Sequence, residues 1–291
     1  MAPVAIAGVG NMGGAIARRL LDQRWPVKVF DIDTAKMAAL EALGATPRAD
    51  AAAAVMGCAV LIVCVVDAQQ TDDVLFGSRG AAQGMHSGQD VLLCPTMAPG
   101  DVEDFARRLA ARGIATIDAP MSGGPARARD GTMSLMVACD DGVFERQRAL
   151  IEAMSSKVFR ISQRPGDGAR TKLVNNLLAG INLAGAAEAL AMAQRLGLDP
   201  AATLDVIEQS SGQSWIGSDR MRRAIAGDYA PRAHVTLLQK DTRLAVQAAA
   251  AAGFEGPLGP AARDVFARAA AAGLGDLDDA ALFRLLAQQG R

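Results

Sequence analysis

The sequence predicts an α/β fold: a doubly wound parallel sheet followed by an all-α domain. Over the first half of the chain, short apolar runs rich in β-branched residues alternate with helical segments, a pattern typical of parallel sheets. After about residue 165 these runs stop, and apolar residues recur only at helical spacing. A chain of 291 residues is long enough for about two domains. We therefore predict a sheet domain over residues 1–163 and an all-helical domain over residues 164–291.

Strands are expected wherever an apolar run is bounded by turn residues or charges. Residues 60–66 (VLIVCVV) give the clearest signal, because a run without polar residues suits a strand that is covered on both faces. Helices are expected between most strands, at 11–22 and at 34–43, the second capped by Thr34 and followed by Gly44. The expected strands are 4–10, 27–33, 60–66, 91–97, 114–119, 133–139 and 158–161.

The second domain is expected to begin with a long helix over residues 168–196. This segment contains no proline, and its apolar residues recur at helical spacing. At 1.5 Å per residue the helix would be about 40 Å long, enough to form the spine of a domain. Further helical segments, several of them rich in alanine, are expected at 200–210, 214–226, 235–252, 257–273 and 276–289.

The charge balance argues against a nucleic-acid partner. Thirty Lys and Arg residues stand against 31 Asp and Glu residues, for a formal net charge of −1, and the sequence contains no basic block. The longest apolar run, residues 58–66, has about half the length of a membrane span, and no signal peptide is visible. We therefore expect a cytoplasmic protein with neither a nucleic-acid partner nor a membrane partner.

The cysteines and histidines do not indicate a metal site. The cysteines lie in apolar stretches without metal-ligand spacing, as expected of reduced core thiols in a cytosolic protein. His86 and His234 are far apart in the sequence, which argues against a histidine-based triad or metal site. The four cysteines are Cys58, Cys64, Cys94 and Cys139.

A glycine-rich turn follows the first expected strand and opens the first expected helix. Its sequence, Gly-Val-Gly-Asn-Met-Gly over residues 8–13, fits the dinucleotide-binding turn of a Rossmann-type sheet. The first glycine allows a tight turn, the second lets a pyrophosphate approach the backbone, and the third allows helix and strand to pack closely. The N–H groups at the start of the helix then face the phosphates. The candidate cofactor-binding residues of this turn are Gly8, Gly10, Asn11, Met12 and Gly13.

An acidic residue at the end of the second expected strand indicates which cofactor binds. Asp31 lies 18 residues after Gly13, where a carboxylate accepts hydrogen bonds from the adenosine ribose hydroxyls and repels a 2′-phosphate. Asp33 could take this role instead, but Asp31 is better placed. We therefore predict NAD rather than NADP as the cofactor.

Four sequence blocks, by their order and spacing, resemble the β-hydroxyacid dehydrogenases. They are GVGNMGGAIA from residue 8, DAPMSGG from residue 118 with GT at 131–132 and MV at 136–137, GARTKLVNN from residue 168, and KD at 240–241. This family includes 3-hydroxyisobutyrate dehydrogenase, tartronate semialdehyde reductase and L-threonate dehydrogenase. The resemblance implies an NAD-dependent oxidoreductase that acts on the CH–OH group of a small hydroxy acid. It also implies a homo-dimer or homo-tetramer.

Lys172 resembles the catalytic lysine of this family. Oxidising an alcohol needs a group that takes the hydroxyl proton while hydride leaves, and a lysine can do this when burial or a neighbouring charge brings its pKa towards neutrality. Asn176 lies one helical turn further on, on the same face, so both side chains can reach one substrate. The Asn176 amide can hydrogen-bond that substrate. We expect Lys172 to be the general acid/base and Asn176 to hold the reacting group.

The block at residues 122–124 is the candidate substrate-binding turn. Ser122, Gly123 and Gly124 offer a hydroxyl and unobstructed backbone N–H groups to a carboxylate, and similar residues in the family bind the substrate acid group. The third glycine of the family block is replaced here by Arg127. A guanidinium at this position either pairs with a more polar acid or points into solvent.

Four further residues are expected to contact the cofactor. Val65 and Val66 end the strand VLIVCVV and should lie under it. Thr96 resembles the family position beside the nicotinamide ribose. Lys240 matches a family lysine that closes over the cofactor from the helical domain.

The leading substrate prediction is a four-carbon sugar acid such as L-threonate. The segment around Trp215 and residues 220–231 looks more like the L-threonate branch of the family than the 3-hydroxyisobutyrate branch, although Trp215 could equally be a core aromatic. The alternatives are 3-hydroxyisobutyrate, tartronate semialdehyde and, further off, imine reduction. An alternative of another class is a non-catalytic, cofactor-bound interaction module; the retained Lys172 and the lack of an appended domain in this sequence argue against it.

Overall fold

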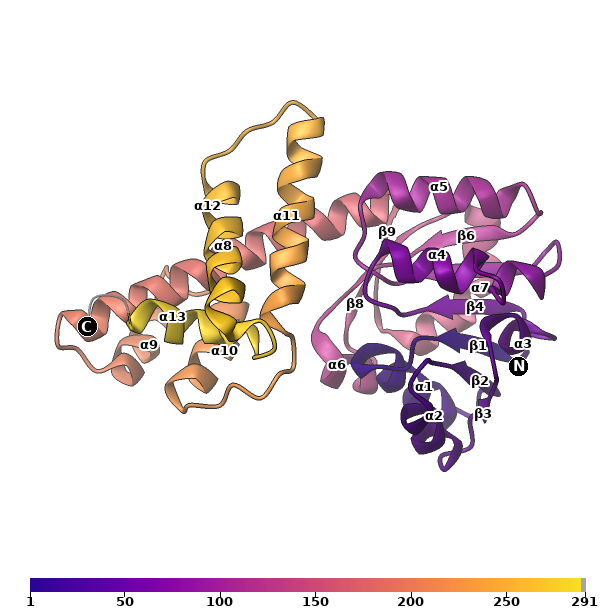
Figure 1. Cartoon of the computed structure of the whole chain (residues 1–291), viewed down its shortest axis with the longest axis horizontal. Helices are drawn as coiled ribbons and strands as arrows, with labels where there is room; N and C mark the ends of the chain where they lie inside the picture. Colours follow the sequence, from indigo (N-terminus) through magenta and orange to yellow (C-terminus); the bar gives the residue numbers. More distant parts are fainter. Residues whose placement is uncertain (289–291) are drawn as a thin grey trace. The chain divides into compact units, whose positions relative to one another are not determined.

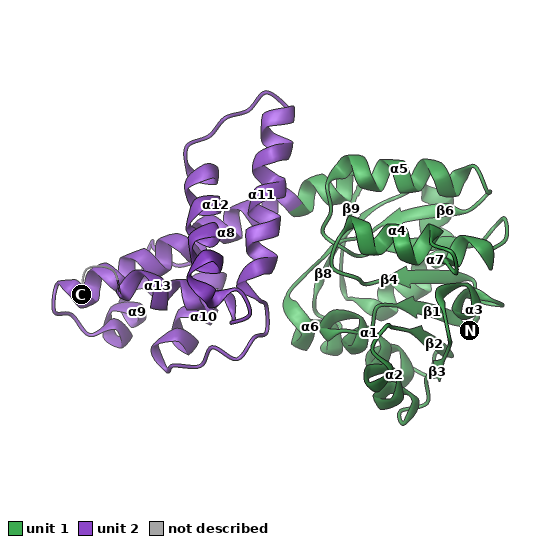
Figure 2. Ribbon diagram, in the orientation of Figure 1, with its two compact units in different colours: residues 1–172 green, residues 173–291 purple. Residues whose placement is uncertain are grey.

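The computed structural model describes residues 1–288 and contains two compact units (Figures 1 and 2). Unit 1 spans Met1–Lys172 and holds the sheet, and the described part of unit 2, which starts at Leu173, is helical. The division between the units therefore falls inside helix α8 (Asp167–Arg195). The predicted division after residue 163 lies in the loop before this helix.

The sheet of unit 1 consists of β1 Val4–Ala7, β2 Val27–Phe30, β3 Thr46–Pro47, β4 Val60–Val63, β5 Asp90–Leu93, β6 Ala115–Asp118, β7 Met121–Ser122, β8 Ser134–Ala138 and β9 Lys157–Ser162. Its order is β3-β2-β1-β4-β5-β6-β8-β7, and β9 also pairs with β8. All pairs from β3 to β6 are parallel, as predicted. The predicted doubly wound sheet is therefore mostly parallel; at the edge beyond β6, β8 runs parallel to β9 but antiparallel to β6 and β7.

Apart from β9, which is longer than the predicted 158–161, the predicted strands are shorter in the structure, mainly because the chain leaves the ladder early at their carboxyl ends. β1 stops at Ala7, since Gly8 turns the chain with φ +86°. β3 and β7 were not predicted, because two residues give no alternating pattern. The residues released at these strand ends build the loops of the candidate site.

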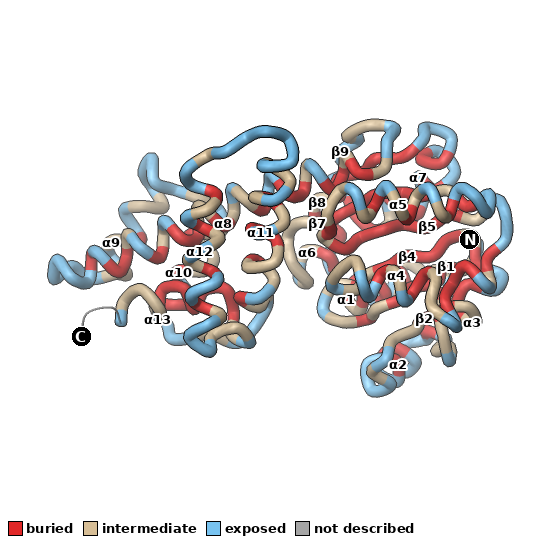
Figure 3. Tube along the Cα trace, turned by 45° about the horizontal axis from the view of Figure 1, so that its top comes forward, coloured by how far each residue is buried: buried red, intermediate tan, exposed pale blue. Residues whose placement is uncertain are grey.

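Helices cover both faces of this sheet (Figure 1). All four residues of β1 are buried, and they alternate between two cores. Ile6 packs with Ile16 of the α1 side, and Ala5 packs with Phe105 of the α5 side, so the strand is covered on both faces, as parallel sheets require (Figure 3). The helices of unit 1 are α1 Asn11–Asp22, α2 Thr34–Glu41, α3 Ala51–Val55, α4 Ala68–Phe76, η1 Ala81–Gln83, α5 Pro99–Ala110, α6 Gly124–Asp130 and α7 Asp141–Met154.

The helices of unit 2 pack around one apolar core. Leu183 and Leu190 of α8 share this core with Phe266, which is fully buried. The helices after α8 are α9 Pro200–Glu208, α10 Trp215–Ile225, α11 Val235–Ala251, α12 Leu258–Ala269, η2 Ala270–Leu274, η3 Asp279–Ala281 and α13 Leu282–Ala287. The helix expected over 276–289 is thus two short pieces, and residue 289 lies outside the described residues.

Helix α8 has the length and apolar composition of a membrane span, and it is the one helix within residues 1–288 that does. Core helices of globular proteins pass the same test. Here Leu183 and Leu190 of α8 lie in the core of unit 2, which accounts for the apolar composition without a membrane.

Candidate active site

The turn between β1 and α1 has the shape of a phosphate-binding loop. A Cβ on Gly8 would lie 2.7 Å from the carbonyl oxygen of Cys64, and a Cβ on Gly13 would lie 1.9 Å from the carbonyl oxygen of Gly8. A side chain is therefore excluded at both positions. A Cβ on Gly10 would meet nothing within 4 Å, and Gly10, the N-cap of α1, gives the helix no side-chain cap. Open space beside uncapped helix N–H groups suits a pyrophosphate.

Asp31, which follows β2, is held against this turn. Its Oδ2 accepts a hydrogen bond from Val9 N (2.6 Å), and its Oδ1 accepts one from Asp33 N (2.9 Å). Asp33 is engaged elsewhere, because its side chain caps α2 by accepting from Ala35 N. The expectation that Thr34 caps this helix is therefore wrong by one residue. Of the two aspartates, Asp31 is the one beside the glycine turn.

The expected residues after β4 and β5 lie at the same sheet edge as the glycine turn, because β1, β4 and β5 run parallel. The Cγ1 of Val65 would lie 2.9 Å from a Cβ on Gly8, so Val65 forms part of the floor of the turn. Val66 is exposed and Thr96 is half-buried. Asn11 and Met12 begin α1 at this edge.

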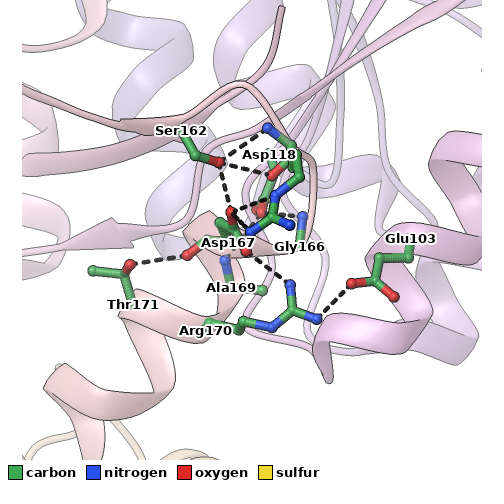
Figure 4. A network of polar contacts seen from close by, with 9 residues as sticks. Glu103, Asp118, Ser162, Gly166, Asp167, Ala169, Arg170 and Thr171 are labelled. Carbon is green, nitrogen blue, oxygen red and sulfur yellow. Dashed lines mark hydrogen bonds and ion pairs between the residues drawn. The ribbon is translucent and has the colours of Figure 1, made fainter.

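Asp118, the last residue of β6, holds the start of helix α8. Its buried Oδ2 accepts hydrogen bonds from Gly166 N (2.8 Å) and Ala169 N (3.0 Å) (Figure 4). A Cβ on Gly168 would lie 2.9 Å from the Asp118 carboxylate, so only glycine permits this approach. Burial raises the pKa of Asp118 to about 6, while the hydrogen bonds from the helix N–H groups act in the opposite direction. The strand thus supplies the N-terminal cap of the helix.

Ion pairs around Asp118 join the same point to other elements of unit 1. Asp167, the first residue of α8, accepts from Ser162 Oγ (2.7 Å) at the end of β9 and pairs with Arg170 (2.9 Å). Arg170 also pairs with Glu103 of α5 (2.6 Å) (Figure 4). Each half-exposed pair contributes little alone, but together they tie the first turn of α8 to β9 and α5.

Lys172 and Asn176 follow on α8, one helical turn apart, as predicted from their spacing. The two residues are only 7 % and 8 % exposed, and lysine is rarely this buried without a partner or a task. Lys172 belongs to unit 1, and Asn176 belongs to unit 2. The burial removes the ordinary explanation of a helix lysine, a solvated surface charge.

The amide of Asn176 is oriented by two neighbours. Its Oδ1 accepts from Asn175 Nδ2 (3.0 Å), and its Nδ2 donates to the buried Asp241 Oδ2 of α11 (2.6 Å). Asp241 Oδ1 lies 2.9 Å from Lys240 Nζ in an ion pair. Because an amide nitrogen carries two hydrogens, Asn176 can donate the second to a substrate. The chain Asn176–Asp241–Lys240 therefore joins two of the predicted residues within unit 2.

Neither Asp118 nor Asp241 was given a role from the sequence, although both lie inside the quoted blocks. The available signal was an acidic residue next to apolar ones at the end of a strand or inside a helix. Such a pattern does not reveal which groups the carboxylate binds, because both aspartates bind residues far away in the chain.

Ser122 ends β7, Gly123 is the N-cap of α6, and Gly124 begins that helix. Gly123 adopts φ +130° and Gly124 adopts φ +75°, backbone conformations that favour glycine. A Cβ on Gly123 would lie 2.9 Å from Arg127 Cδ, so the half-buried Arg127 packs its aliphatic stem against this turn. Trp215 begins α10 and is 49 % exposed, so the alternative of a core aromatic is wrong.

The comparison with known proteins covers nearly the whole chain. Residues 3–162 match the family model described as the NAD binding domain of 6-phosphogluconate dehydrogenase. Residues 166–286 match the model described as NAD-binding of NADP-dependent 3-hydroxyisobutyrate dehydrogenase. Together they account for both the sheet and the helical segment.

The similar proteins include dehydrogenases of small hydroxy acids. L-threonate dehydrogenase of Cupriavidus necator is 37 % identical over 282 residues, covering 97 % of this chain and 95 % of the relative. 3-Hydroxyisobutyrate dehydrogenase of Pseudomonas aeruginosa is 36 % identical and covers 91 % of each chain. The crystal structure of a 3-hydroxyisobutyrate dehydrogenase from Salmonella typhimurium superposes with a TM-score of 0.92 at 35 % identity, covering 98 % of this chain and 100 % of the other.

The glycine turn contains one position where the fold excludes a Cβ, Gly13, and one where it leaves room for a Cβ, Gly10. Gly13→Ala should destabilise the protein by about 1–3 kcal/mol or more through its clash with the Gly8 carbonyl. Gly10→Ala should change the unfolding free energy by less than about 0.5 kcal/mol yet weaken NADH binding at least about tenfold. Urea unfolding and NADH fluorescence titration measure the two effects. Unchanged NADH binding by Gly10→Ala would show that the pyrophosphate lies elsewhere.

The raised pKa of Asp118 predicts a pH-dependent contribution to stability. Folding raises this pKa from 3.8 to about 6, so the folded protein retains a proton that the unfolded chain has released. The stability of wild type relative to Asp118→Asn should therefore fall between about pH 4 and about pH 7, by up to about 3 kcal/mol. Asp167→Asn is the matched control: hydrogen bonding by Ser162 lowers the pKa of Asp167, so its contribution to stability is lost only as the pH falls below about 4. Between about pH 5 and pH 7 the stability of wild type relative to Asp167→Asn should therefore stay nearly constant. Urea unfolding across this range decides, and parallel curves for wild type and Asp118→Asn contradict the prediction.

Proposed function

Since this chain belongs to the β-hydroxyacid dehydrogenase family, we propose that it oxidises L-threonate or a related four-carbon sugar acid with NAD. Membership of the family makes it a nicotinamide-dependent oxidoreductase of small hydroxy acids. The observation that carries the substrate class is the 32–37 % identity to five L-threonate dehydrogenases over 97 % of the chain. 3-Hydroxyisobutyrate is the second candidate, favoured by the 36 % identity to a dehydrogenase of that acid.

The residues of the glycine turn fit a nicotinamide dinucleotide. The space beside Gly10 and the uncapped N–H groups of α1 suit the pyrophosphate. Asp31 lies beside the same turn, where its carboxylate would bind the ribose hydroxyls and repel a 2′-phosphate. This geometry supports NAD over NADP. Bound there, the nicotinamide supplies the acceptor for hydride.

Each proposed site residue has a task in the oxidation. Lys172 accepts the proton of the substrate hydroxyl and returns it in the reverse direction. Asn176 donates an N–H to the reacting oxygen, with its amide held in the required orientation by Asp241. The hydroxyl of Ser122 and the N–H groups that follow it bind the carboxylate. The burial of Lys172 supports this assignment, because a lysine shielded from water does not serve as a solvated surface charge.

The remaining predicted contacts complete the proposal. Val65, Val66 and Thr96 line the cofactor at the ends of β4 and β5, and Lys240 contacts it from α11.

The protein acts in the cytoplasm as a homo-dimer or homo-tetramer. Exposed apolar side chains along α8, including Val174 (72 %) and Leu178 (58 %), offer surface for such an assembly. Multi-angle light scattering should give the mass of two or four chains, and the mass of one chain at micromolar concentration contradicts the assembly.

The substrate proposal is tested by a panel of hydroxy acids with NAD. L-threonate should give the highest kcat/KM among L-threonate, D-erythronate, 3-hydroxyisobutyrate, D-glycerate and L-serine, measured by NADH absorbance. The physical reason is that a site built to hydrogen-bond substrate hydroxyls rejects analogues that lack them, by about 10⁴-fold at best. If kcat/KM is clearly highest for 3-hydroxyisobutyrate, the L-threonate proposal is wrong and 3-hydroxyisobutyrate is the substrate. No turnover of any acid, with NADH binding intact, contradicts the function.

The cofactor proposal is tested at Asp31. Asp31→Asn keeps an acceptor for Val9 N but loses the negative charge, so the ratio of kcat/KM for NAD over NADP should fall at least about tenfold, or about 1.4 kcal/mol. Asp33→Asn removes a charge two residues away that caps α2, and it should leave the ratio within about twofold of wild type. Equal effects of the two variants would show that Asp31 does not face the ribose.

A further inference from the structure

Two of the four thiols lie together beneath the glycine turn. Cys64 and Cys94 directly follow β4 and β5, whose last residues Val63 and Leu93 stand opposite each other in the parallel ladder. The Cys94 N–H extends this ladder by donating to the Val63 carbonyl (3.0 Å). The two cysteines are therefore the next pair in register, on strands about 4.8 Å apart. A disulfide spans Cα separations of about 4.4–6.8 Å.

The two side chains also share one face of the sheet. Cys94 belongs to the core on the α1 side, and Cys64 packs against that core. Burial and then the hydrogen bond with the Cys64 thiol raise the pKa of Cys94 well above its usual value. Register and face thus agree in placing the two side chains next to each other.

The other two thiols have different partners and serve as internal controls. The Cys58 thiol donates to the Ala54 carbonyl (3.3 Å), and Cys139 Sγ accepts from Arg160 Nη1 (3.2 Å). Both residues are buried, like Cys94. Their geometry offers no thiol partner in register.

Cys64 also touches the turn that takes the dinucleotide in the proposed function. A Cβ on Gly13 would lie 3.0 Å from the Cβ of Cys64, and the Cys64 carbonyl oxygen limits Gly8 in the same way. The Gly8 carbonyl is the nearest obstacle at Gly13, with the Cys64 Cβ next to it, and the Cys64 backbone carbonyl is the nearest obstacle at Gly8. A change of position or size at Cys64 therefore alters the floor of the turn.

We propose that Cys64 and Cys94 form a peroxide-sensitive thiol pair, and that its oxidation to a disulfide weakens dinucleotide binding at the glycine turn. The proposal rests on the proposed function only in assigning the dinucleotide to this turn. Cys64 is half-buried, whereas Cys94 is 4 % exposed, so a small hydroperoxide reaches Cys64 first.

The chemistry proceeds in two balanced steps. The Cys64 sulfur attacks one oxygen of hydrogen peroxide, the O–O bond breaks, and a sulfenic acid and one water form. The Cys94 sulfur then attacks the Cys64 sulfur, the S–O bond breaks, and the hydroxyl leaves as a second water with the Cys94 thiol proton. Peroxide takes up two electrons and both thiol protons end in water. The new S–S bond changes the position of the Cys64 side chain, whose Cβ lies next to Gly13.

The experiment treats the reduced full-length protein with hydrogen peroxide and follows it by non-reducing peptide mass spectrometry and NADH fluorescence titration. We expect a loss of two hydrogen masses, a linked Cys64–Cys94 peptide, and a Kd for NADH at least about tenfold higher, all reversed by dithiothreitol. Cys58→Ser and Cys139→Ser should respond as wild type does. For Cys64→Ser, the Kd for NADH after peroxide treatment should equal the Kd of the same variant before treatment. Cys94→Ser should form no disulfide.

Three results would overturn the proposal: both thiols left unlinked, a link between other cysteines, or a linked protein that binds NADH as tightly as the reduced one. Failure of the reduced wild-type protein to bind NADH would contradict the proposed function instead. The linked peptide is measured without any cofactor, so the two failures are distinguishable.

Discussion

The hydrogen bonds that the start of α8 donates to Asp118 are the constraint on which the proposed chemistry depends. An α-helix turns about 100° and rises 1.5 Å per residue, so the direction of every side chain on its next turn follows from its first turn. Gly166 and Ala169 fix that first turn on the carboxylate at the end of β6. Lys172 comes less than one turn later. Its placement in unit 1 is thus set by a strand of the sheet and not by the helix alone.

The same device recurs in the interior of both units. Buried carboxylates at Asp118, Asp241 and Asp278 each bind groups from distant parts of the chain: Asp118 binds the start of α8, Asp241 binds Asn176 (2.6 Å), and Asp278 binds Arg223 (2.7 Å). A buried charge without such partners costs several kcal/mol. Each carboxylate therefore favours the one arrangement in which its donors are present. Apolar packing stabilises the units, whereas these bonds define where particular polar side chains lie.

Local sequence patterns were sufficient for the sheet core and for the glycine turn. The apolar run 60–66 contains no polar residue that would need solvent. At Gly8 and Gly13 of the turn, a Cβ would clash with backbone atoms, which explains why these positions hold glycine. Most strand ends were placed too late, the end of β1 because composition does not reveal that Gly8 turns the chain with a positive φ. The spacing of Lys172 and Asn176 likewise needed no tertiary information. One helical turn separates them in any α-helix.

The features that escaped prediction are those made by long-range contacts. Asp118 and Gly166 are 48 residues apart, and Asn176 and Asp241 are 65 residues apart. The spacing of apolar residues, with a period of two in strands and 3.6 in helices, gives no information about pairs so far apart in the sequence. The antiparallel return of β8 depends in the same way on pairing with the two-residue β7, which has no pattern of its own. The family resemblance marked these segments as important but gave Asp118 and Asp241 no task.

The most direct measurement of the central claim is chemical rescue of Lys172→Ala. The variant should bind NADH normally and lose at least about 10²-fold in kcat with its best acid, because the proton acceptor is missing. Added methylamine should restore part of that rate in proportion to its concentration, whereas tetramethylammonium, which cannot take a proton, should not. If Lys172→Ala retains the wild-type kcat without added amine, Lys172 is not the general base, and the start of α8 does not place the proton acceptor of the reaction.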